Sequence, residues 1–342
     1  MKPIVITKYP DPQLEERWNE FLKNAHRPTH YTTPNFMVDP FIRGGERLAI
    51  LAEDEGGRIS GVITGVIDEK NFRSGMAVRP QAAFRKDIDL RDTASTMFEG
   101  LGSIGDKKLD FIEFYTWDPV PEFVDLGFRE KICGGDNSVV MLDLTKGADE
   151  LFKEFSQTRR NEIRKVIRKG ELEVKTLETE DELRELYEIH VDWNKRKEIK
   201  PDSFKDFSFA QDQTEYRKTL IAKHDGKVIA GSYYRFCRGG MIEYAANNSL
   251  VEYQKLRPND LIGWRSIEWA CEAEFTEYSM GGSHLFLRRF GGDLVHAYRY
   301  KMDLSFLHVH DAKESIVNLG LKTYRNLPKS VKSGIKKIAG KK

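Results

Sequence analysis

Two glycine doublets and an arginine pair lie close together near the end of the chain. The stretch from Tyr278 to Gly292 reads YSMGGSHLFLRRFGG, so that Arg288 and Arg289 directly precede Phe290-Gly291-Gly292. Glycine-rich stretches bind phosphate when they read GxGxxG after a strand or GxxxxGK[ST] before a helix. Neither spelling occurs here, and residues 297–304 alternate like a strand. The arginines are therefore candidates for binding negative charge outside a nucleotide loop.

A strand, a loop and a helix follow one another in residues 241–270, MIEYAANNSLVEYQKLRPNDLIGWRSIEWA. An acyl-donor site requires this order, because the free N–H groups and the dipole of a helix N-terminus attract phosphate. The predicted helix is apolar nearly all round its circumference, which places it centrally in the fold rather than on the surface.

The elements that must position these residues occur twice. A glycine-led strand containing Gly61 is followed 31 residues later by a helix near Asp92, and a strand containing Gly231 is followed 29 residues later by a helix near Asp260. Near-equal spacings of like elements predict a duplicated α/β unit with an offset of about 170 residues. We place the units at 1–145 and 146–305, followed by a tail at 306–342.

Each unit begins with helical sequence. In the second unit we predict one helix over 149–168 and another over 181–199, the latter with an apolar stripe that contains His190. We interpret His190 as a packed core residue, because an isolated histidine on an apolar stripe is more often packed than a ligand. A strand over 139–144 is expected to close the first unit.

Together these segments resemble the Fem-type branch of the GNAT-like acyltransferases, over roughly residues 5–305. The resemblance depends on FSQTRRNEIRKVIRKGELEV (155–174), the strands around Gly231, the LRPNDLIGWRSIEWACE helix and the GG…FGG finish. It implies two tandem GNAT-like units, an α/β (α+β) fold in which each unit is a mixed, mostly antiparallel sheet flanked by helices. It also implies transfer of an acyl or aminoacyl group to an amine, as in peptidoglycan bridge formation.

Two departures from the family pattern affect the chemistry. GNAT enzymes carry Q/R-x-x-G-x-G/A before this helix, where glycines let N–H groups approach the pyrophosphate of coenzyme A. The matching residues here run from Gln254 to Asn259, and Pro258 has no N–H to donate. The family's Phe-Lys-x-x-Phe-Gly-Gly finish has Leu287 at its lysine position.

Amide formation needs a proton acceptor for the amine and donors near the developing oxyanion. The candidate catalytic residues are Arg288, Arg289, Glu243 and Asp260. Candidate substrate-binding residues near them are Tyr244, Asn247, Gln254, Lys255, Arg257 and Asn259. The alternative interpretation is that the arginines are solvated and that Asp260 only stabilises a helix N-terminus.

A basic helix is predicted over residues 156–169, which hold six basic residues and one acidic residue. Arg160, Arg164 and Arg168 recur at i, i+4 spacing and so share one face. That face could bind the phosphate of tRNA, of a nucleotide-linked sugar or of a lipid pyrophosphate. An ordinary solvated face is an equal alternative.

Charge is distributed unevenly along the chain. Its 55 basic and 54 acidic residues nearly cancel, yet residues 306–342 hold nine basic and two acidic side chains. This tail could contact an anionic membrane near a lipid-linked acceptor, and a flexible solvated tail is the alternative. The near-neutral body gives no electrostatic argument for nucleic acid, although tRNA remains a partner that the resemblance implies.

Composition restricts the remaining classes. The three cysteines are far apart and suggest neither a disulfide framework nor a metal site. The N-terminus does not resemble a signal peptide, and no apolar run is long enough to span a bilayer. We therefore expect a cytoplasmic protein, and any peripheral contact with the membrane is expected through its tail.

The expected function is an acyltransferase without a permanently bound cofactor. Its donor is acyl-CoA or aminoacyl-tRNA, and its acceptor is a small-molecule or lipid-linked amine, such as a cell-wall or cell-envelope precursor. A non-catalytic binding module that retains the fold, or an acyl-CoA-dependent biosynthetic N-acetyltransferase, is the alternative.

Overall fold

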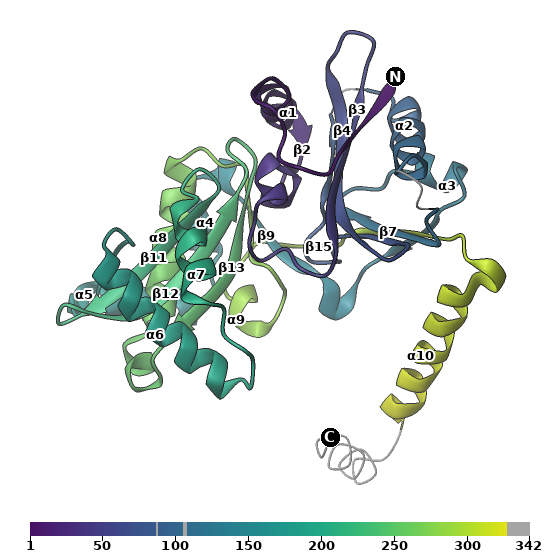
Figure 1. The fold of residues 1–342 in the computed structure, drawn as a ribbon. Helices are drawn as coiled ribbons and strands as arrows, with labels where there is room; N and C mark the ends of the chain where they lie inside the picture. The colour runs from purple at the N-terminus through teal and green to yellow at the C-terminus, as the bar shows by residue number, and fades with distance from the viewer. Residues whose placement is uncertain (87, 105–107, 327–342) are drawn as a thin grey trace.

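Two β-sheets with helices on their faces make up the protein, seen here in a computed structural model that describes residues 1–86, 88–104 and 108–326. The first sheet and its helices occupy the upper right of Figure 1, and the second sheet with most of the helices occupies the left. The predicted class, a mixed α/β fold built from two sheets, is confirmed.

The first sheet runs in the order β1-β3-β4-β5-β7-β16-β8, with β6 paired to β4 and to β2. All its pairs are antiparallel except β5 with β7. Its strands are β1 (Lys2–Ile6), β2 (Ala25–His26), β3 (Glu46–Glu53), β4 (Ile59–Asp68), β5 (Asn71–Ser74), β6 (Ala82–Arg85), β7 (Phe111–Thr116), β8 (Arg129–Ile132) and β16 (Tyr298–Asp303).

The second sheet runs in the order β10-β11-β12-β13-β14-β9-β15. Its one parallel pair is β13 with β14. Its strands are β9 (Val139–Asp143), β10 (Glu173–Thr176), β11 (Arg217–His224), β12 (Lys227–Phe236), β13 (Met241–Ser249), β14 (Glu277–Ser279) and β15 (Asp293–Val295).

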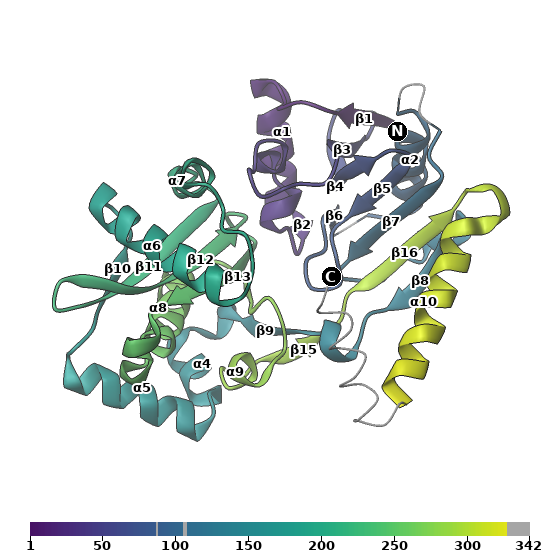
Figure 2. The same cartoon turned by 60° about the horizontal axis from the view of Figure 1, so that its bottom comes forward.

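The two sheets exchange strands across the boundary that we predicted at residues 145 and 146. Strand β9 comes from the first half of the chain and lies between β14 and β15 of the second sheet. Strand β16 comes from the second half and lies between β7 and β8 of the first sheet, as Figure 2 shows. Residues 297–304 do form a strand, but it completes the other unit, so the halves are interlocked.

Helices cover both faces of the second sheet. Over the whole described chain, the helices are α1 (Pro12–Lys23), α2 (Arg91–Gly102), α3 (Glu122–Asp125), α4 (Ala148–Glu154), α5 (Gln157–Lys169), α6 (Glu180–Arg196), α7 (Phe204–Asp212), α8 (Pro258–Glu272), α9 (Leu285–Arg288) and α10 (Val309–Asn326), and α1, α2, α3 and α10 lie beside the first sheet. Short 3-10 turns are η1 (His30–Thr32), η2 (Pro34–Met37), η3 (Gly135–Asn137), η4 (Leu144–Lys146), η5 (Val251–Leu256) and η6 (Phe306–His308). Helix α8 packs in one core with Ala230 of β12, whereas α6 and α7 pack in another with Ile221 of β11.

The two strand glycines that indicated a duplication have the same physical role. A Cβ on Gly231 would lie 2.5 Å from the Leu186 side chain of α6, and a Cβ on Gly61 would lie 2.7 Å from Met97 of α2. Each glycine therefore lets a helix approach its sheet closely.

The predicted single helix over 149–168 is wrong, because it is two helices that meet at Phe155 and Ser156. The Ser156 hydroxyl accepts a hydrogen bond from the backbone N–H of Arg159, which caps α5, and Phe155 is extended and buried. A serine at this position favours the start of a new helix over the continuation of α4, because its hydroxyl accepts from a free N–H in the first turn of α5.

Helix α10, at the lower right of Figure 1, begins beside the first sheet, where Asp311 and Glu314 form ion pairs with Lys301 and Arg299 of β16. The part of the predicted tail from 327 to 342 lies outside the described residues. Among the helices that are described, none combines the length and the apolar character needed to cross a bilayer.

The second glycine doublet fixes the path from α9 into β15. Gly291 and Gly292 have φ of +76° and +78°, in the left-handed region that side chains disfavour. A Cβ on Gly292 would lie 2.5 Å from the carbonyl oxygen of Met141, which is in the neighbouring strand β9. The doublet is thus needed for a close backbone approach and not for a ligand.

We expect Gly292→Ala to lower the free energy of unfolding by at least about 2 kcal/mol, because left-handed strain of about 1–2 kcal/mol adds to a backbone clash. Gly226→Ala is the matched control, since Gly226 has φ of +79° and no atom within 4 Å of an added Cβ. Urea unfolding of both variants measures the difference. Equal losses would show that the approach to β9 is not tight.

Candidate active site

Strands β13 and β14 are the centre of the candidate site, because they part after a short parallel pairing. Their register covers only residues 241–243 against residues 277–279. On its other side β13 carries an irregularity at Ala245, where its pairing with β12 shifts between Tyr233 and Tyr234. Within the described chain no strand pairs with the edge of β13 that β14 leaves, along residues 245–248. A bound molecule could therefore hydrogen-bond to this backbone.

Glu243 stands where the strands part, and it is ion-paired with an arginine of the first half. Its carboxylate is buried and contacts Arg79 Nε, and Arg79 Nη2 donates a 3.1 Å hydrogen bond to the carbonyl of Ala245. The nearby carboxylate raises the pKa of Arg79. This contact joins the two halves of the chain at the site, and a role for Glu243 as proton acceptor stays a prediction.

Asp260, the other acidic candidate, forms a buried ion pair with Arg159 of α5. The guanidinium of Arg159 lies 4.4 Å from the ring centres of Phe286 and Phe290, and its Nη2 donates to the carbonyl of Phe286 at 3.0 Å. Arg159 was not among the predicted site residues, although the sequence places it at the start of the basic helix. The pair ties α5, α8 and the FLRRFGG segment together.

The two arginines of that segment differ in their surroundings. Arg288 is exposed and its Nε donates to the carbonyl of Ser283 at 2.6 Å. Arg289 is half-buried, and no acid or carbonyl contacts its guanidinium among the described residues. Leu287, at the family's lysine position, is buried in the core of the second sheet.

Three arginines, Arg159, Arg257 and Arg289, lie near the N-terminus of α8 and act on one another electrostatically. Burial lowers the pKa of Arg159 to about 10, with opposition from Glu162 and with further lowering by the charges of Arg289 and Arg257. Arg257 forms a 2.9 Å ion pair with Glu162 and precedes the helix with φ of +60°. Arg289 therefore faces other cations without a counter-charge, as a phosphate-binding group would.

The backbone at this N-terminus is largely occupied. The N–H groups of Asp260 and Leu261 both donate to the carbonyl of Arg257, at 3.2 and 3.3 Å. Pro258 has none, so Asn259 is left with the free N–H of the first turn. Gln254 and Lys255 are exposed on η5, and Asn259 Nδ2 donates to Ser249 Oγ at 3.4 Å. The pyrophosphate cradle of ordinary GNAT enzymes is absent from this part of the structure.

The three arginines of the basic face of α5 have different surroundings. Arg160 is turned back on its own chain, where Nη1 donates to the carbonyl of Phe155 at 2.7 Å, so it closes the end of α4. Arg164 is exposed with its guanidinium 5.2 Å from the Phe152 ring centre, and Arg168 is exposed. Binding of phosphate by this face stays a prediction for Arg164 and Arg168.

Tyr244 and Asn247 lie on β13 on either side of its irregularity. Burial raises the pKa of Tyr244, whose ring centre is 6.0 Å from that of Tyr234. Asn247 is half-buried and opposite Ser232 in the strand register. Both residues belong to the strand that carries the open edge, and a role in orienting a substrate stays a prediction.

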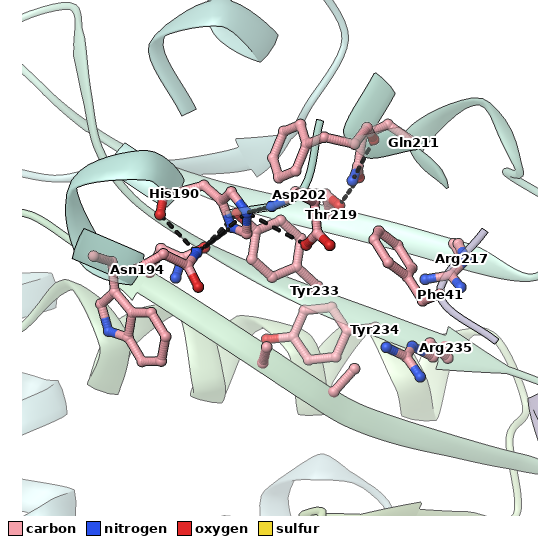
Figure 3. A pocket seen from close by; sticks show the side chains of 15 residues that line it. Phe41, His190, Asn194, Asp202, Gln211, Arg217, Thr219, Tyr233, Tyr234 and Arg235 are labelled. Carbon is pink, nitrogen blue, oxygen red and sulfur yellow. Dashed lines mark hydrogen bonds and ion pairs between the residues drawn. The ribbon is translucent and has the colours of Figure 1, made fainter. Parts of the chain in front are cut away.

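A cavity of about 210 Å³ opens on the α6 and α7 face of the sheet, next to that edge (Figure 3). Ala245 and Ala246 of β13 belong to its wall, and Phe41 from the first half of the chain closes one side. The remaining lining residues are His190, Trp193, Asn194, Asp202, Phe207, Gln211, Arg217, Thr219, Tyr233, Tyr234, Arg235 and Asn248. No sequence pattern indicated this cavity, because its walls come from segments as far apart as Phe41 and Asn248.

His190 is buried as predicted, but it lines this cavity. Its Nδ1 lies 3.3 Å from Asn248 Oδ1, and its Nε2 accepts from the backbone N–H of Asp202 at 3.3 Å. Burial lowers the pKa of His190, while the hydrogen bond to Asn248 and the charge of Asp202 oppose that shift. The lowered pKa favours the neutral imidazole at pH 7, and its lone pair on Nε2 is engaged by the backbone N–H of Asp202.

A group of potential metal ligands occurs elsewhere, at Asp303, His308 and Asp311. The carboxylate of Asp311 is ion-paired with Arg129 and Lys301, so cations already neutralise it. The cluster gives no support for a metal.

Comparison with known proteins identifies the architecture. Residues 153–302 match the sequence pattern of an acetyltransferase (GNAT) domain. A comparison with curated proteins found no match.

Among solved structures, FemX covers 89% of this chain and 98% of its own, with a TM-score of 0.70 at 13% identity. The C-terminal domain of a protein assigned as a lysylphosphatidylglycerol synthetase from Agrobacterium fabrum covers 90% and 96%, with 0.60 at 13%. A tandem GNAT protein from the clavulanic acid biosynthesis pathway covers 89% and 99%, with 0.53 at 12%. Residues 153–302 thus match a GNAT acetyltransferase domain, and the whole chain has the same fold as FemX and the tandem GNAT protein.

Proposed function

We propose that this protein transfers an acyl or aminoacyl group to the amine of a small or envelope-linked acceptor. One observation carries the proposal: the cavity reaches the open edge of β13 at Ala245 and Ala246. A donor hydrogen-bonded along that edge and an acceptor in the cavity would bring a carbonyl and an amine together. Proximity of this kind lowers the barrier of a two-substrate reaction.

The donor is more consistent with an aminoacyl-tRNA than with acyl-CoA. The first turn of α8 has too few free N–H groups for a coenzyme A pyrophosphate, as described above. Arg289 and Arg257 instead offer side-chain cations, which suit a phosphate at the end of a larger donor. The sequence resemblance to Fem-type enzymes points the same way.

In the proposed reaction the amine nitrogen attacks the acyl carbonyl carbon, and the ester or thioester bond breaks as the amide forms. In this proposal the backbone N–H groups along residues 245–248 that do not pair with β12 stabilise the oxyanion. The neutral imidazole of His190 accepts the proton from the amine at Nε2, in exchange for the hydrogen bond from the backbone N–H of Asp202, and the leaving alcohol or thiol takes up a proton in turn. Glu243 then keeps Arg79 in place at the strand edge and does not act as the base.

The acceptor fits a cell-envelope precursor only through its amine-bearing end, because the cavity is small. The alternative function is a binding module that retains the fold without chemistry. It is favoured by Leu287, whose burial in the core leaves no cation at the family's lysine position.

We further propose that the C-terminal helix contacts an anionic membrane. Large apolar side chains are exposed around its start and along it, including Phe306 at 86%, Leu307 at 77% and Ile316 at 70%. Residues 306–342 also hold nine basic and two acidic side chains. Apolar insertion and attraction to anionic lipid act together in peripheral binding.

The transfer proposal is tested by incubating the purified full chain with charged tRNAs or with acyl-CoAs and a pool of amines. Mass spectrometry of the pool detects any new amide. We expect amide formation with at least one charged tRNA. Failure to consume either donor class, with binding in the cavity retained, would leave the binding-module alternative.

Arg289→Ala should raise KM for the donor about tenfold, because one charge-assisted contact to phosphate is worth about 1.5–3 kcal/mol. Arg265→Ala is the matched control, since Arg265 lies on α8 at an exposed position paired with Glu268. Steady-state kinetics at fixed acceptor measures both. An unchanged KM in the Arg289 variant contradicts its role in donor binding.

The pH profile tests His190. Because the pKa of His190 is lowered from its usual value and the neutral form is active, kcat/KM should be constant at neutral pH. It should fall only as the pH decreases through that lowered pKa. His190→Gln should remove this acid limb and reduce kcat about 100-fold, whereas His224→Gln, outside the cavity, should preserve both. An acid limb that survives in His190→Gln assigns the base elsewhere.

Membrane contact is tested by sedimentation with vesicles of phosphatidylglycerol and phosphatidylcholine. The double variant Phe306→Ser, Ile316→Ser should bind at least about tenfold more weakly, because each buried apolar side chain contributes about 1.5–3 kcal/mol. Phe209→Ser, which alters an exposed aromatic on α7, is the control. Equal sedimentation of both variants would exclude α10 as the contact.

A further inference from the structure

Two arginines stand side by side at one end of the cavity. Arg217 of β11 and Arg235 of β12 are direct cross-strand partners, and both line the cavity (Figure 3). Arg217 is only 7% exposed. Like charges placed directly opposite each other destabilise a sheet, so this arrangement requires a compensating anion.

The chain supplies one anion beside Arg217. Asp39, which is 1% exposed, is ion-paired with Arg217, and its carboxylate also accepts a 2.8 Å hydrogen bond from His30 Nε2. Burial lowers the pKa of His30 to about 4, so His30 is neutral at pH 7 and does not change the balance. Burial would raise the pKa of Asp39, but the hydrogen bond from His30 and the charge of Arg217 outweigh it and lower that pKa.

The nearby acid Glu243 is shared by two arginines. It lies opposite Arg235 in the register of β12 and β13, where burial alone would lower the pKa of Arg235 and the charge of Glu243 helps to raise it, but it also forms the ion pair with Arg79. Asp39 and Glu243 are thus two acids for the three arginines at positions 79, 217 and 235. Arg235 contacts the hydroxyl of Tyr31 and lies over its ring at 5.4 Å, and neither group carries a negative charge. The cluster is left with one excess positive charge facing the cavity.

The guanidinium groups also have unused donors. The Nε atoms of Arg217 and Arg235 are both buried and without a hydrogen-bond partner. Buried donors are nearly always satisfied, so these two leave the hydrogen-bonding capacity of the adjacent guanidinium groups incompletely used. Planar guanidinium groups in this position match the oxygens of an oxyanion.

The rest of the cavity limits what that anion belongs to. Phe41, Phe207 and Tyr233 provide apolar walls, and the volume of about 210 Å³ admits a small molecule. At the other end His190, Asn248 and Asp202 offer acceptors for an amine. The cavity is therefore cationic at one end and rich in acceptors at the other.

We propose that the cavity binds an amine acceptor that also carries a carboxylate, with the carboxylate held by Arg217 and Arg235. This inference rests on the proposed function, and it identifies the acceptor as an amino acid or the terminal residue of a short peptide. A single excess positive charge is balanced by a monoanion. A phosphate, which carries close to two negative charges at pH 7, would leave one uncompensated.

Equilibrium binding without any donor tests the proposal. Calorimetry on the full chain compares free L-amino acids and dipeptides with the same compounds as C-terminal amides, and with inorganic phosphate. We expect at least one free acid to bind at least about tenfold more tightly than its amide, since a lost contact to a charged group is worth about 1.5–3 kcal/mol. Equal binding of acid and amide, or tighter binding of phosphate, overturns the proposal.

Arg235→Gln is the diagnostic variant, because it removes the excess charge and leaves the pair of Asp39 with Arg217 intact. It should abolish the preference for the acid while leaving the melting temperature of the free protein unchanged or higher. A purely structural role for Arg235 would lower that temperature and keep the preference. Arg184→Gln, an exposed arginine of α6 paired with Glu180, is the control and should change neither property.

The inference and the proposed function can fail separately. Acid-selective binding without any transfer refutes the function and supports the inference. Transfer to an amine whose KM is the same in the wild type and in Arg235→Gln supports the function and refutes the inference.

Discussion

Buried ion pairs between the two halves of the chain are the constraint on which the site depends. Asp39 of the first half must remain beside Arg217 of the second, and Arg79 beside Glu243, because an unpaired charge at these depths costs several kcal/mol. The pair of Asp39 holds the segment after η2, and the pair of Arg79 holds the loop between β5 and β6, against the second sheet. The cavity exists only while that contact is made, since Phe41 forms part of its wall.

The strand exchange reinforces the same contact. With β9 in the second sheet and β16 in the first, separating the halves would break backbone hydrogen bonds on two sheets. Residues of both halves of the chain consequently line the same cavity. The two units differ in role, because α6 and α7 cover the second sheet on the face that bears Arg217 and Arg235, and the cavity lies there.

Several predicted chemical groups serve to build the site's frame. Asp260 binds Arg159 between two phenylalanine rings, Arg160 closes α4, and the glycine doublet at 291–292 allows β15 to pass close to β9. Their residue types suggested chemistry, because charged residues and glycines are also the residues that pair segments in the core and allow two backbones to approach closely. Arg289 is the member of this group whose charge has no partner among the described residues, and it is the one that we place on the donor.

The sequence by itself determined the class of fold, the duplication and the order of elements, because helical and strand periodicity and turn residues act locally. It also located the segment from β13 to α8, where strand, loop and helix are contiguous. Only the tertiary structure decided where β9 and β16 pair, that His190 borders a cavity, and that Arg217 and Arg235 lie side by side near Asp39. Arg235 is visible in the sequence as a charge within an apolar strand. Its neighbours Arg217 and Asp39 come close to it only when distant parts of the chain pack together. No local pattern encodes that neighbourhood, since burial and charge balance are properties of the folded chain.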